Sequence, residues 1–232
     1  MTSHSQVLLA PAPAITYLRF KRILDFTFSL MLLIALAPLF LVIALAITLD
    51  SPGPVFFLQE RVGSRRITTH AGFVWVLRNF RMIKFRSMQH HADETAHQEH
   101  IQAYVQGETG EGAGRALKPV HDKRVTRVGA VLRRFSVDEL PQLLNVLKGE
   151  MSLIGPRPVP LYEFDAYPDS ALGRFAATPG MTGLWQVRGR CSLSFQEQIA
   201  LDIAYTERQS LELDLKILLW TVPAVLFCRG AE

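Results

Sequence analysis

An uncharged apolar run near the N-terminus limits the folds open to this chain more than any other feature. The run extends from Phe26 to Leu49, and its only polar members are Thr27, Ser29 and Thr48. A helix of this length can cross the hydrocarbon core of a bilayer. The run begins too late and is too long for the apolar core of a secretory signal peptide, which is the alternative interpretation. We therefore predict a membrane segment here.

Two features leave the path of this segment open. Pro38 lies in the middle of the run, where it removes one backbone hydrogen bond and favours a kink. Basic residues flank both ends, so the positive-inside tendency assigns neither end to a side of the membrane. A helix that bends at Pro38 and returns to its starting side fits both flanks, but prolines also occur in helices that pass straight through. The flanking residues are Arg19, Lys21 and Arg22 before the run and Arg61, Arg65 and Arg66 after it.

The composition favours one domain with an attached membrane element. The chain has 232 residues, of which 49% are hydrophobic, and its mean hydropathy is positive. A net charge of +4 and a pI of about 9.3 favour anionic partners such as phosphates, nucleotides or an acidic membrane face. Cys191 and Cys228 have no metal-like spacing, so a disulfide framework is not expected and a reducing cytoplasmic setting fits best.

The acidic pair Asp138-Glu139 is the strongest candidate for chemistry. Apolar residues follow it at helical spacing, so an amphipathic helix is predicted to begin here. In one interpretation, Ser136 and Glu139 form a capping box at its start. In the other, Asp138 is the N-cap and Pro141 is the third helical residue. Either start puts both carboxylates at a helix N-terminus. The spaced apolar residues are Leu140, Leu143, Leu144 and Leu147.

The setting of this pair favours ionised side chains. The helix dipole and the preceding Arg133 and Arg134 stabilise negative charge at this place. A carboxylate that acts as a nucleophile or as a metal ligand has to be ionised and oriented. Taken alone, Asp138 and Glu139 also fit ordinary acids of a first helical turn, so the rest of the chain has to decide between the two interpretations.

Basic residues gather in three further segments, and together they indicate a charged small ligand. Lys84 and Arg86 alternate with apolar residues as in a strand, and two neighbouring cations suit a phosphate or pyrophosphate. Residues 122–134 carry five cations, for which nucleic acid is the generic partner, but the nearby acidic pair and membrane segment favour a small anion. Arg157 lies between two prolines, which lower the entropy that its side chain loses on binding an anion.

The remaining elements are predicted from short patterns. Strands are expected at Val55–Leu58 and Met151–Ile154, and a helix at Phe195–Tyr205, whereas residues 64–80 show little pattern. The segment Leu213–Phe227 is apolar but interrupted by a proline, so it is expected to lie in the membrane interface.

Two groups of side chains need a choice between interpretations. Trp185 lies in a glycine-punctuated loop and belongs either to the core or to an aromatic face for a base or a lipid. Four histidines lack the spacing of a zinc site, so a solvated helix followed by a loop is expected around them. They are His90, His91, His97 and His100.

Four sequence blocks, in this order, resemble the bacterial sugar transferases of the monotopic phosphoglycosyl transferase family, which are polyprenyl-phosphate sugar-1-phosphate transferases. The resemblance runs from about Lys21 to Leu226. It implies an α+β fold, mostly helical with a small β-sheet, together with a re-entrant membrane helix hairpin broken at Pro38 and interfacial amphipathic helices. The blocks are Lys84–Met88, Ser136–Asn145, Met151–Pro158 and Pro179–Arg190.

The resemblance also implies a domain organisation and a location. Residues 1–20 are expected to form an N-terminal tail, residues 21–50 the re-entrant helix, and residues 51–232 a catalytic domain with an interfacial C-terminal helix. This domain would lie on the cytoplasmic face of the bacterial inner membrane, in a monotopic protein without a multi-span N-terminal domain. Two departures from the family pattern occur, because residues 64–80 are longer than the usual link and Glu212 stands where tryptophan is frequent.

The implied reaction transfers a sugar-1-phosphate from a UDP-sugar to undecaprenyl phosphate, releases UMP and starts a bacterial glycan such as an exopolysaccharide, capsule, O-antigen or glycoprotein. Asp138 would attack the sugar-linked phosphorus and form a covalent intermediate, and Glu139 would act beside it. Both would hold the required Mg²⁺. Membrane lipids but no nucleic acid would be partners, and a homo-oligomer is also compatible. The residues expected to bind substrate are Lys84, Arg86, Arg133, Arg134, Arg157, Gln186 and Arg188.

Two functions of other classes stand as alternatives. A membrane-anchored binding protein would use the basic face to recruit an anionic partner without turnover. A phosphohydrolase would use Asp138 through an aspartyl phosphate and would need only water as the acceptor. No part of the sequence identifies the sugar.

Overall fold

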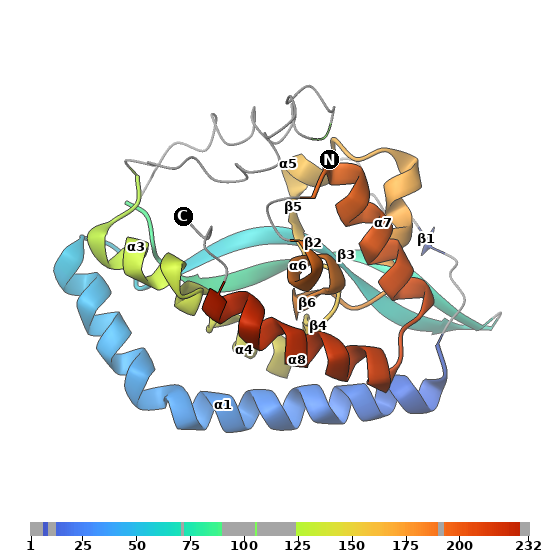
Figure 1. Cartoon of the computed structure of the whole chain (residues 1–232), viewed down its shortest axis with the longest axis horizontal. Coiled ribbons are helices and arrows are strands. Elements are labelled where there is room, and N and C mark those ends of the chain that lie inside the picture. The colour runs from blue at the N-terminus through green and yellow to red at the C-terminus, as the bar shows by residue number, and fades with distance from the viewer. Residues whose placement is uncertain are drawn as a thin grey trace.

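The computed structural model of the chain describes residues 7–8, 13–70, 72–89, 105, 124–189 and 193–227. The histidine-rich segment at 90–100 and both cysteines lie outside the described residues. Within them, several helices pack around two small sheets (Figure 1). The predicted class, mixed helices with a small β-sheet, is therefore confirmed.

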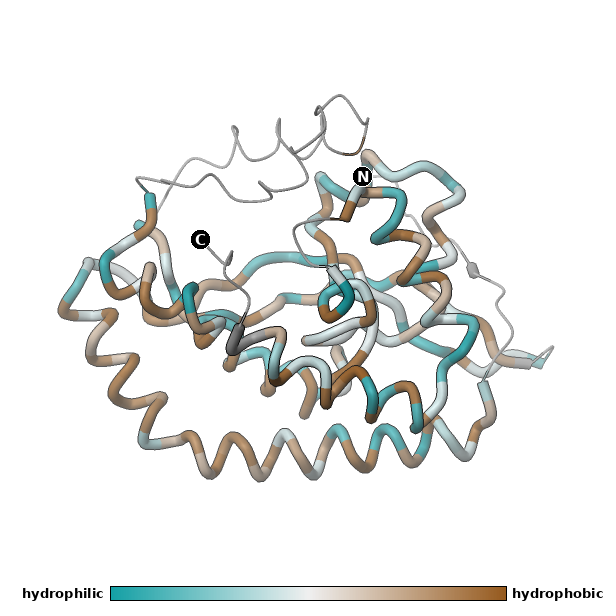
Figure 2. The backbone as a smooth tube through the Cα atoms, viewed as in Figure 1, coloured by the Kyte–Doolittle hydropathy of each residue, from teal (hydrophilic) through white to brown (hydrophobic). Residues whose placement is uncertain are grey.

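The predicted membrane segment is part of one long helix, α1 (Ile15–Asp50). This helix is long and apolar enough to cross a membrane. Pro38 lies inside it, and Figure 1 shows α1 as a longer and a shorter arm joined by a bend. The predicted kink is thus a bend in a continuous helix, as is usual where a proline removes one helical hydrogen bond. In Figure 2 the middle of α1 and its shorter arm are mostly hydrophobic.

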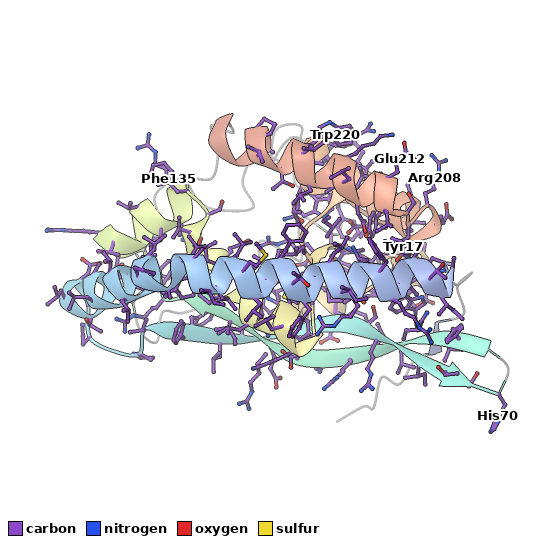
Figure 3. All side chains as sticks on the ribbon, turned by 90° about the horizontal axis from the view of Figure 1, so that it is seen from below. Tyr17, His70, Phe135, Arg208, Glu212 and Trp220 are labelled. Carbon is purple, nitrogen blue, oxygen red and sulfur yellow. The ribbon has the colours of Figure 1, made fainter. Side chains whose placement is uncertain are left out.

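A long hairpin forms most of the larger sheet. Its arms, β2 (Phe56–Thr69) and β3 (Gly72–Phe85), pair antiparallel along their whole length, and His70 lies at the tip (Figure 3). The strands β1 (Val7–Leu8) and β5 (Val159–Pro160) pair with its two outer edges, which gives the order β1-β3-β2-β5. The sheet therefore joins the N-terminal part of the chain to the segment that follows Arg157.

The sequence prediction for this hairpin is wrong in extent. The strand expected at Val55–Leu58 is the beginning of a much longer strand, and residues 64–69 and 72–80, where the sequence shows little pattern, form parts of both arms. The cause is the run of consecutive apolar residues at Phe73–Leu77, which hides the period of two that marks a half-buried strand. These residues form strands because they pair with residues of the other arm, and their local sequence pattern does not indicate it.

The acidic pair lies in a short 3₁₀ turn between two helices. The helix α3 (Arg127–Arg134) precedes this turn, η2 (Val137–Glu139), and α4 (Gln142–Lys148) follows it. α4 ends at Gly149, which adopts the left-handed conformation with φ 78° that glycine commonly has just after the last helical residue.

Neither predicted start of the helix after the acidic pair is correct. Ser136 has a left-handed backbone with φ 55°, and its side chain makes no capping hydrogen bond. Pro141 occupies the N-cap position of α4. Because Pro141 has no amide hydrogen, an α-helix cannot continue through it with full hydrogen bonding. The preceding turn closes instead by a hydrogen bond from the Leu140 amide to the Val137 carbonyl.

The rest of the described chain consists of short elements followed by two longer helices. β4 and β6 form a parallel two-stranded sheet. The strand predicted at Met151–Ile154 and the helix predicted at Phe195–Tyr205 are confirmed. The elements are β4 (Ser152–Ile154), α5 (Leu161–Phe164), η3 (Asp169–Phe175), β6 (Gly180–Thr182), α6 (Leu184–Arg188), α7 (Phe195–Glu207) and α8 (Leu211–Phe227).

A buried polar cluster fixes the N-terminal arm of α1 to the two last helices. Asp214 of α8 pairs with Lys21 at 2.7 Å and accepts a hydrogen bond from Tyr17 at 2.9 Å. Tyr205 of α7 donates to the other carboxylate oxygen of Asp214 at 2.8 Å. Figure 3 shows Tyr17 at the edge of α1 that faces α8. Three helices that are distant in sequence are therefore joined at one carboxylate.

The C-terminal arm of α1 packs against the same folded body. Ile43 and Ile47 are buried in a cluster with Phe85 and Leu132. Asp50 accepts a hydrogen bond from the backbone amide of Val128 at 3.0 Å. Most apolar side chains between the two attached ends are exposed. They include Phe26, Phe28, Met31, Leu32, Ile34, Leu39, Leu41 and Val42.

Gly155 is a position where the fold leaves no room for a side chain. A Cβ atom added there would lie 2.2 Å from the carbonyl oxygen of Thr178 and 2.9 Å from the amide nitrogen of Gly180. Both obstacles are backbone atoms, so Gly155→Ala is expected to destabilise the protein by about 1–3 kcal/mol, seen as a lower melting temperature in detergent. Gly173→Ala is the control, because its nearest neighbour is a flexible Ile203 side chain at 3.4 Å. Equal melting temperatures for the two variants would contradict this prediction.

Candidate active site

Three segments bring charged side chains together at one end of the hairpin. Lys84 stands near the end of β3, Glu139 in η2, and Arg157 in the loop before β5. The Nζ atom of Lys84 lies 2.8 Å from Oε1 of Glu139, and Nη2 of Arg157 lies 3.4 Å from the same oxygen. Three residues that the sequence singled out are thus in contact, although up to 73 positions separate them.

Asp138 completes this cluster. It is 9% exposed, and its charge acts on Lys84 together with that of Glu139. Burial lowers the pKa of Lys84 below its usual range, while Glu139 and Asp138 oppose that shift and Arg157 adds to it. The two neighbouring carboxylates therefore lie within the field of half-buried cations, as a carboxylate that attacks a phosphate ester requires.

Arg61 is a member of the cluster that the sequence did not reveal. It lies on β2 opposite Pro160 of β5, and its Nη1 donates to the carbonyl oxygen of Pro158 at 3.2 Å. Burial, and then the charge of Arg157, lower the pKa of Arg61 to about 10, so it remains charged at neutral pH. Only the pairing of β2 with β5 brings it here, and no local motif indicates that pairing.

A buried ion pair supports the loop that carries Arg157. Nη2 of Arg174 donates to the carbonyl oxygen of Arg157 at 3.0 Å and lies 2.6 Å from Asp202. Tyr167 accepts a further hydrogen bond from Arg174 at 2.8 Å. Burial raises the pKa of Asp202 to about 6, and the charge of Arg174 opposes this rise. The carboxylate is therefore ionised at neutral pH. No local sequence pattern indicates this support, because its residues lie in segments that are distant along the chain.

Arg86, also predicted to bind substrate, contacts the C-terminal end of α1 rather than the cluster around Glu139. It is buried, and its guanidinium donates to the carbonyl oxygens of Ile47, Ser51 and Pro52, where α1 ends. Cations at a helix C-terminus satisfy carbonyl groups that have no intrahelical partner. Arg86 thus holds the shorter arm of α1 in place, two residues from Lys84 of the cluster.

The other predicted substrate-binding residues lie on α3 and α6. Arg133 and Arg134 are in the last turn of α3, just before η2. Arg188 of α6 is exposed and lies over the ring of Trp220, with 5.3 Å between its Cζ and the ring centroid. Gln186 contacts the Met181 carbonyl at 3.5 Å.

The burial of Trp185 decides between a core residue and an aromatic face for a ligand. Trp185 lies in α6 and is buried, which supports the core interpretation over the ligand-facing one. An indole at this depth packs against its neighbours and presents no open face to a base or a lipid.

The donor set of the cluster fits a magnesium ion that is shared with a substrate. Among the residues that the structure describes, no group of three or more His, Cys, Asp or Glu side chains is placed to hold a metal. Mg²⁺ is usually bound by one or two carboxylates together with substrate phosphates and water. Asp138 and Glu139 provide such a pair, so the residues present are compatible with this ion.

Comparison with known proteins places the chain in a family. The model of the family described as bacterial sugar transferase matches residues 16–228. The exopolysaccharide production protein ExoY of Sinorhizobium fredii is 38% identical over 214 residues, covering 91% of this chain and 87% of that protein. The UDP-glucose:undecaprenyl-phosphate glucose-1-phosphate transferase of Caulobacter vibrioides is 40% identical over 230 residues, covering 95% and 75%.

A relative from a third organism matches over a similar share of this chain. The undecaprenyl-phosphate galactose phosphotransferase of Salmonella typhimurium is 36% identical over 211 residues, which cover 91% of this chain and 41% of that longer protein. The match to the family model extends over α1, the hairpin and the acidic pair alike. The resemblance carried by the four sequence blocks is confirmed, and the chain belongs to the bacterial sugar transferase family.

Proposed function

We propose that this protein transfers a sugar-1-phosphate from a UDP-sugar to undecaprenyl phosphate, releases UMP, and so starts an exopolysaccharide or another surface glycan. The observation that carries the proposal is the contact of Glu139 with Lys84 and Arg157, next to the buried Asp138. Two carboxylates among cations suit a substrate with two phosphates. The names of the relatives from Caulobacter and Salmonella support the polyprenyl-phosphate acceptor.

The proposed chemistry has two displacements at one phosphorus atom. In the first, a carboxylate oxygen of Asp138 bonds to the sugar-linked phosphorus, and the bond to UMP breaks with its electron pair leaving on UMP. In the second, a phosphate oxygen of the lipid bonds to that phosphorus, and the bond to Asp138 breaks. Each partner then meets the enzyme separately, one from water and one from the membrane.

The basic residues of the cluster have separate tasks in this scheme. Lys84 and Arg157 bring positive charge to the oxygens of the transferring phosphate, and Glu139 holds both in place. Arg61 and Arg174 fix the backbone of the loop that carries Arg157. A Mg²⁺ ion held by Asp138 and Glu139 would neutralise part of the diphosphate charge.

We further propose that α1 enters the bilayer and leaves it on the same side, with the catalytic domain on the cytoplasmic face. Both arms of α1 are attached to one folded body, at Asp214 and at Val128. A helix that crossed a bilayer would have its two ends about 30 Å apart, on opposite faces. The exposed apolar side chains between the attached ends would face lipid, and those of α8 would lie in the interface.

Cysteine labelling tests this path of α1. In a variant whose two native cysteines are replaced by serine, Thr16→Cys and Ser51→Cys are expected to react with a membrane-impermeant maleimide from the same side of sealed inner-membrane vesicles. Ile34→Cys, which replaces an exposed side chain of the apolar middle, is expected to be protected until detergent is added. Labelling of the two end positions from opposite sides would show that the helix crosses the membrane.

The activity itself is tested by UMP release from the purified chain with Mg²⁺, undecaprenyl phosphate and a panel of UDP-sugars. Release that requires the lipid phosphate supports the transferase and identifies the sugar. Release without the lipid supports the phosphohydrolase, because water then replaces the acceptor. Absence of release with every donor would overturn the proposal for UDP-sugars and favour a binding protein.

A further inference from the structure

A basic cavity lies between the N-terminal arm of α1 and the β2–β3 hairpin. Its volume is about 200 Å³, and residues at the end of α4 and in α7 complete its walls. In Figure 3 the hairpin runs beside α1. Trp75, which lines this cavity, and Lys84 of the candidate active site lie on the same strand, about 30 Å apart at the rise of an extended chain. The cavity is therefore separate from the site of Asp138.

Cations outnumber acids in the wall of this cavity. Lys21 and Arg22 come from α1 and Arg66 comes from β2, whereas Asp25 is the one carboxylate among the described lining residues. The neighbouring Arg65 is exposed, and its side chain lies on the other face of β2. Lys21 already has an ion-pair partner. The guanidinium of Arg22 donates to two backbone carbonyls at the end of α4, which are neutral and leave its charge in place. The wall thus carries positive charge that the fold does not balance.

Two buried N–H donors of the wall have no partner in the described part of the chain. They are Nε1 of Trp75, a residue 2% exposed, and Nη1 of Arg66. The two residues are opposite each other on β2 and β3, so their side chains lie on the same face of the hairpin. The guanidinium of Arg66 lies over the ring of Phe73, with 4.3 Å between its Cζ and the ring centroid, a contact that supplies no anion. Burial and the nearby Arg19 lower the pKa of Arg66, which agrees with a charge that no carboxylate balances. Buried donors without an acceptor are costly to a fold.

We propose that this cavity binds a phosphate group, and that the headgroup of an anionic phospholipid supplies it. Phosphate oxygens would accept from the indole and the guanidinium, and their charge would balance the arginines. The side chains that follow Lys21 and Arg22 on the free face of α1, Ile23 and Phe26, are apolar and exposed. The cavity therefore lies at the level where headgroups meet acyl chains. This site is independent of the transfer reaction.

The test measures the melting temperature of the full chain in dodecyl maltoside at constant ionic strength. Dioctanoyl phosphatidylglycerol, dioctanoyl phosphatidylcholine and inorganic phosphate are titrated in parallel. Phosphatidylglycerol is expected to raise the melting temperature, because a ligand that binds only the folded state stabilises it, and phosphatidylcholine is not. The concentration of phosphatidylglycerol at half effect is expected to rise about tenfold in Arg66→Gln and about threefold in Trp75→Phe.

Two matched variants control for the loss of an indole and of an arginine. Trp185→Phe removes another buried Nε1 atom that has no described partner but does not line the cavity, and Arg78→Gln removes an exposed arginine of β3. Both are expected to respond to phosphatidylglycerol like the native chain. If inorganic phosphate gives the same shift with the same dependence on Arg66, the site stands and its ligand is free phosphate.

A response to phosphatidylglycerol that survives both Arg66→Gln and Trp75→Phe, or that the two control variants also lose, would overturn the proposal. Trp75→Phe keeps an aromatic side chain in the core, so the test holds even where Arg66→Gln lowers the yield of folded protein. UMP release measured on the same samples separates this result from the proposed activity, since neither residue belongs to the candidate active site.

Discussion

Asp138→Asn is expected to lower UMP release by at least about 1000-fold, because an uncharged amide cannot serve as the nucleophile. The two side chains have nearly the same size, and Asp138 lies in a turn that its backbone hydrogen bonds define, so the fold should be retained. The measurement is the initial rate with undecaprenyl phosphate and the best donor. With a donor labelled in its sugar-linked phosphate and no acceptor, the native chain is expected to carry the label and the variant none.

Asp169→Asn is the matched control for this experiment. Asp169 is an exposed acid at the start of η3, and its replacement should leave the rate within about twofold, as is usual for surface substitutions. A variant at Asp138 that keeps a tenth of the native rate would exclude the covalent route through this residue. Equal melting temperatures of the native chain and Asp138→Asn are needed for that conclusion.

The parts of the site that the sequence could predict are those encoded by neighbouring residues. Asp138 and Glu139 stand together in the chain, and the alternation around Lys84 indicates a strand without any knowledge of its partner. Arg157 is constrained by the two prolines beside it. Each of these signals depends on backbone geometry within a few residues, which is why these residues could be singled out without knowledge of their contacts.

The parts that the sequence could not predict depend on pairings between distant segments. Arg61 lies at the site only because β2 pairs with β5. Arg86 lies outside it because its guanidinium donates to backbone carbonyls at the end of α1. Local periodicity carries no information on either partner. The prediction of where α4 starts is wrong for another reason. Ser136 and Asp138 are both residue types that often cap helices, but Pro141 occupies the N-cap position.

Asp214→Asn is expected to destabilise the protein by about 3 kcal/mol, the lower end of the range for breaking a buried ion pair. The change leaves the ammonium of Lys21 buried without its partner at 2.7 Å, although Asp25 nearby still attracts it. The expected loss corresponds to a melting temperature lower by roughly 6–12 °C for a chain of this size. Lys21→Met in the same chain should recover much of the loss, because it removes the uncompensated charge and keeps the length of the side chain.

The control for this prediction lies on the same helix. Glu212 and Lys216 also form an ion pair, but their side chains are 77% and 53% exposed. Glu212→Gln is therefore expected to cost less than about 0.5 kcal/mol, since water and salt screen an exposed pair. If Asp214→Asn is as mild as this control, the N-terminal arm of α1 is not held to the folded body by Lys21. One of the two attachments that keep both ends of α1 on one side of the membrane would then be absent, and the labelling of Thr16→Cys would decide the path of α1.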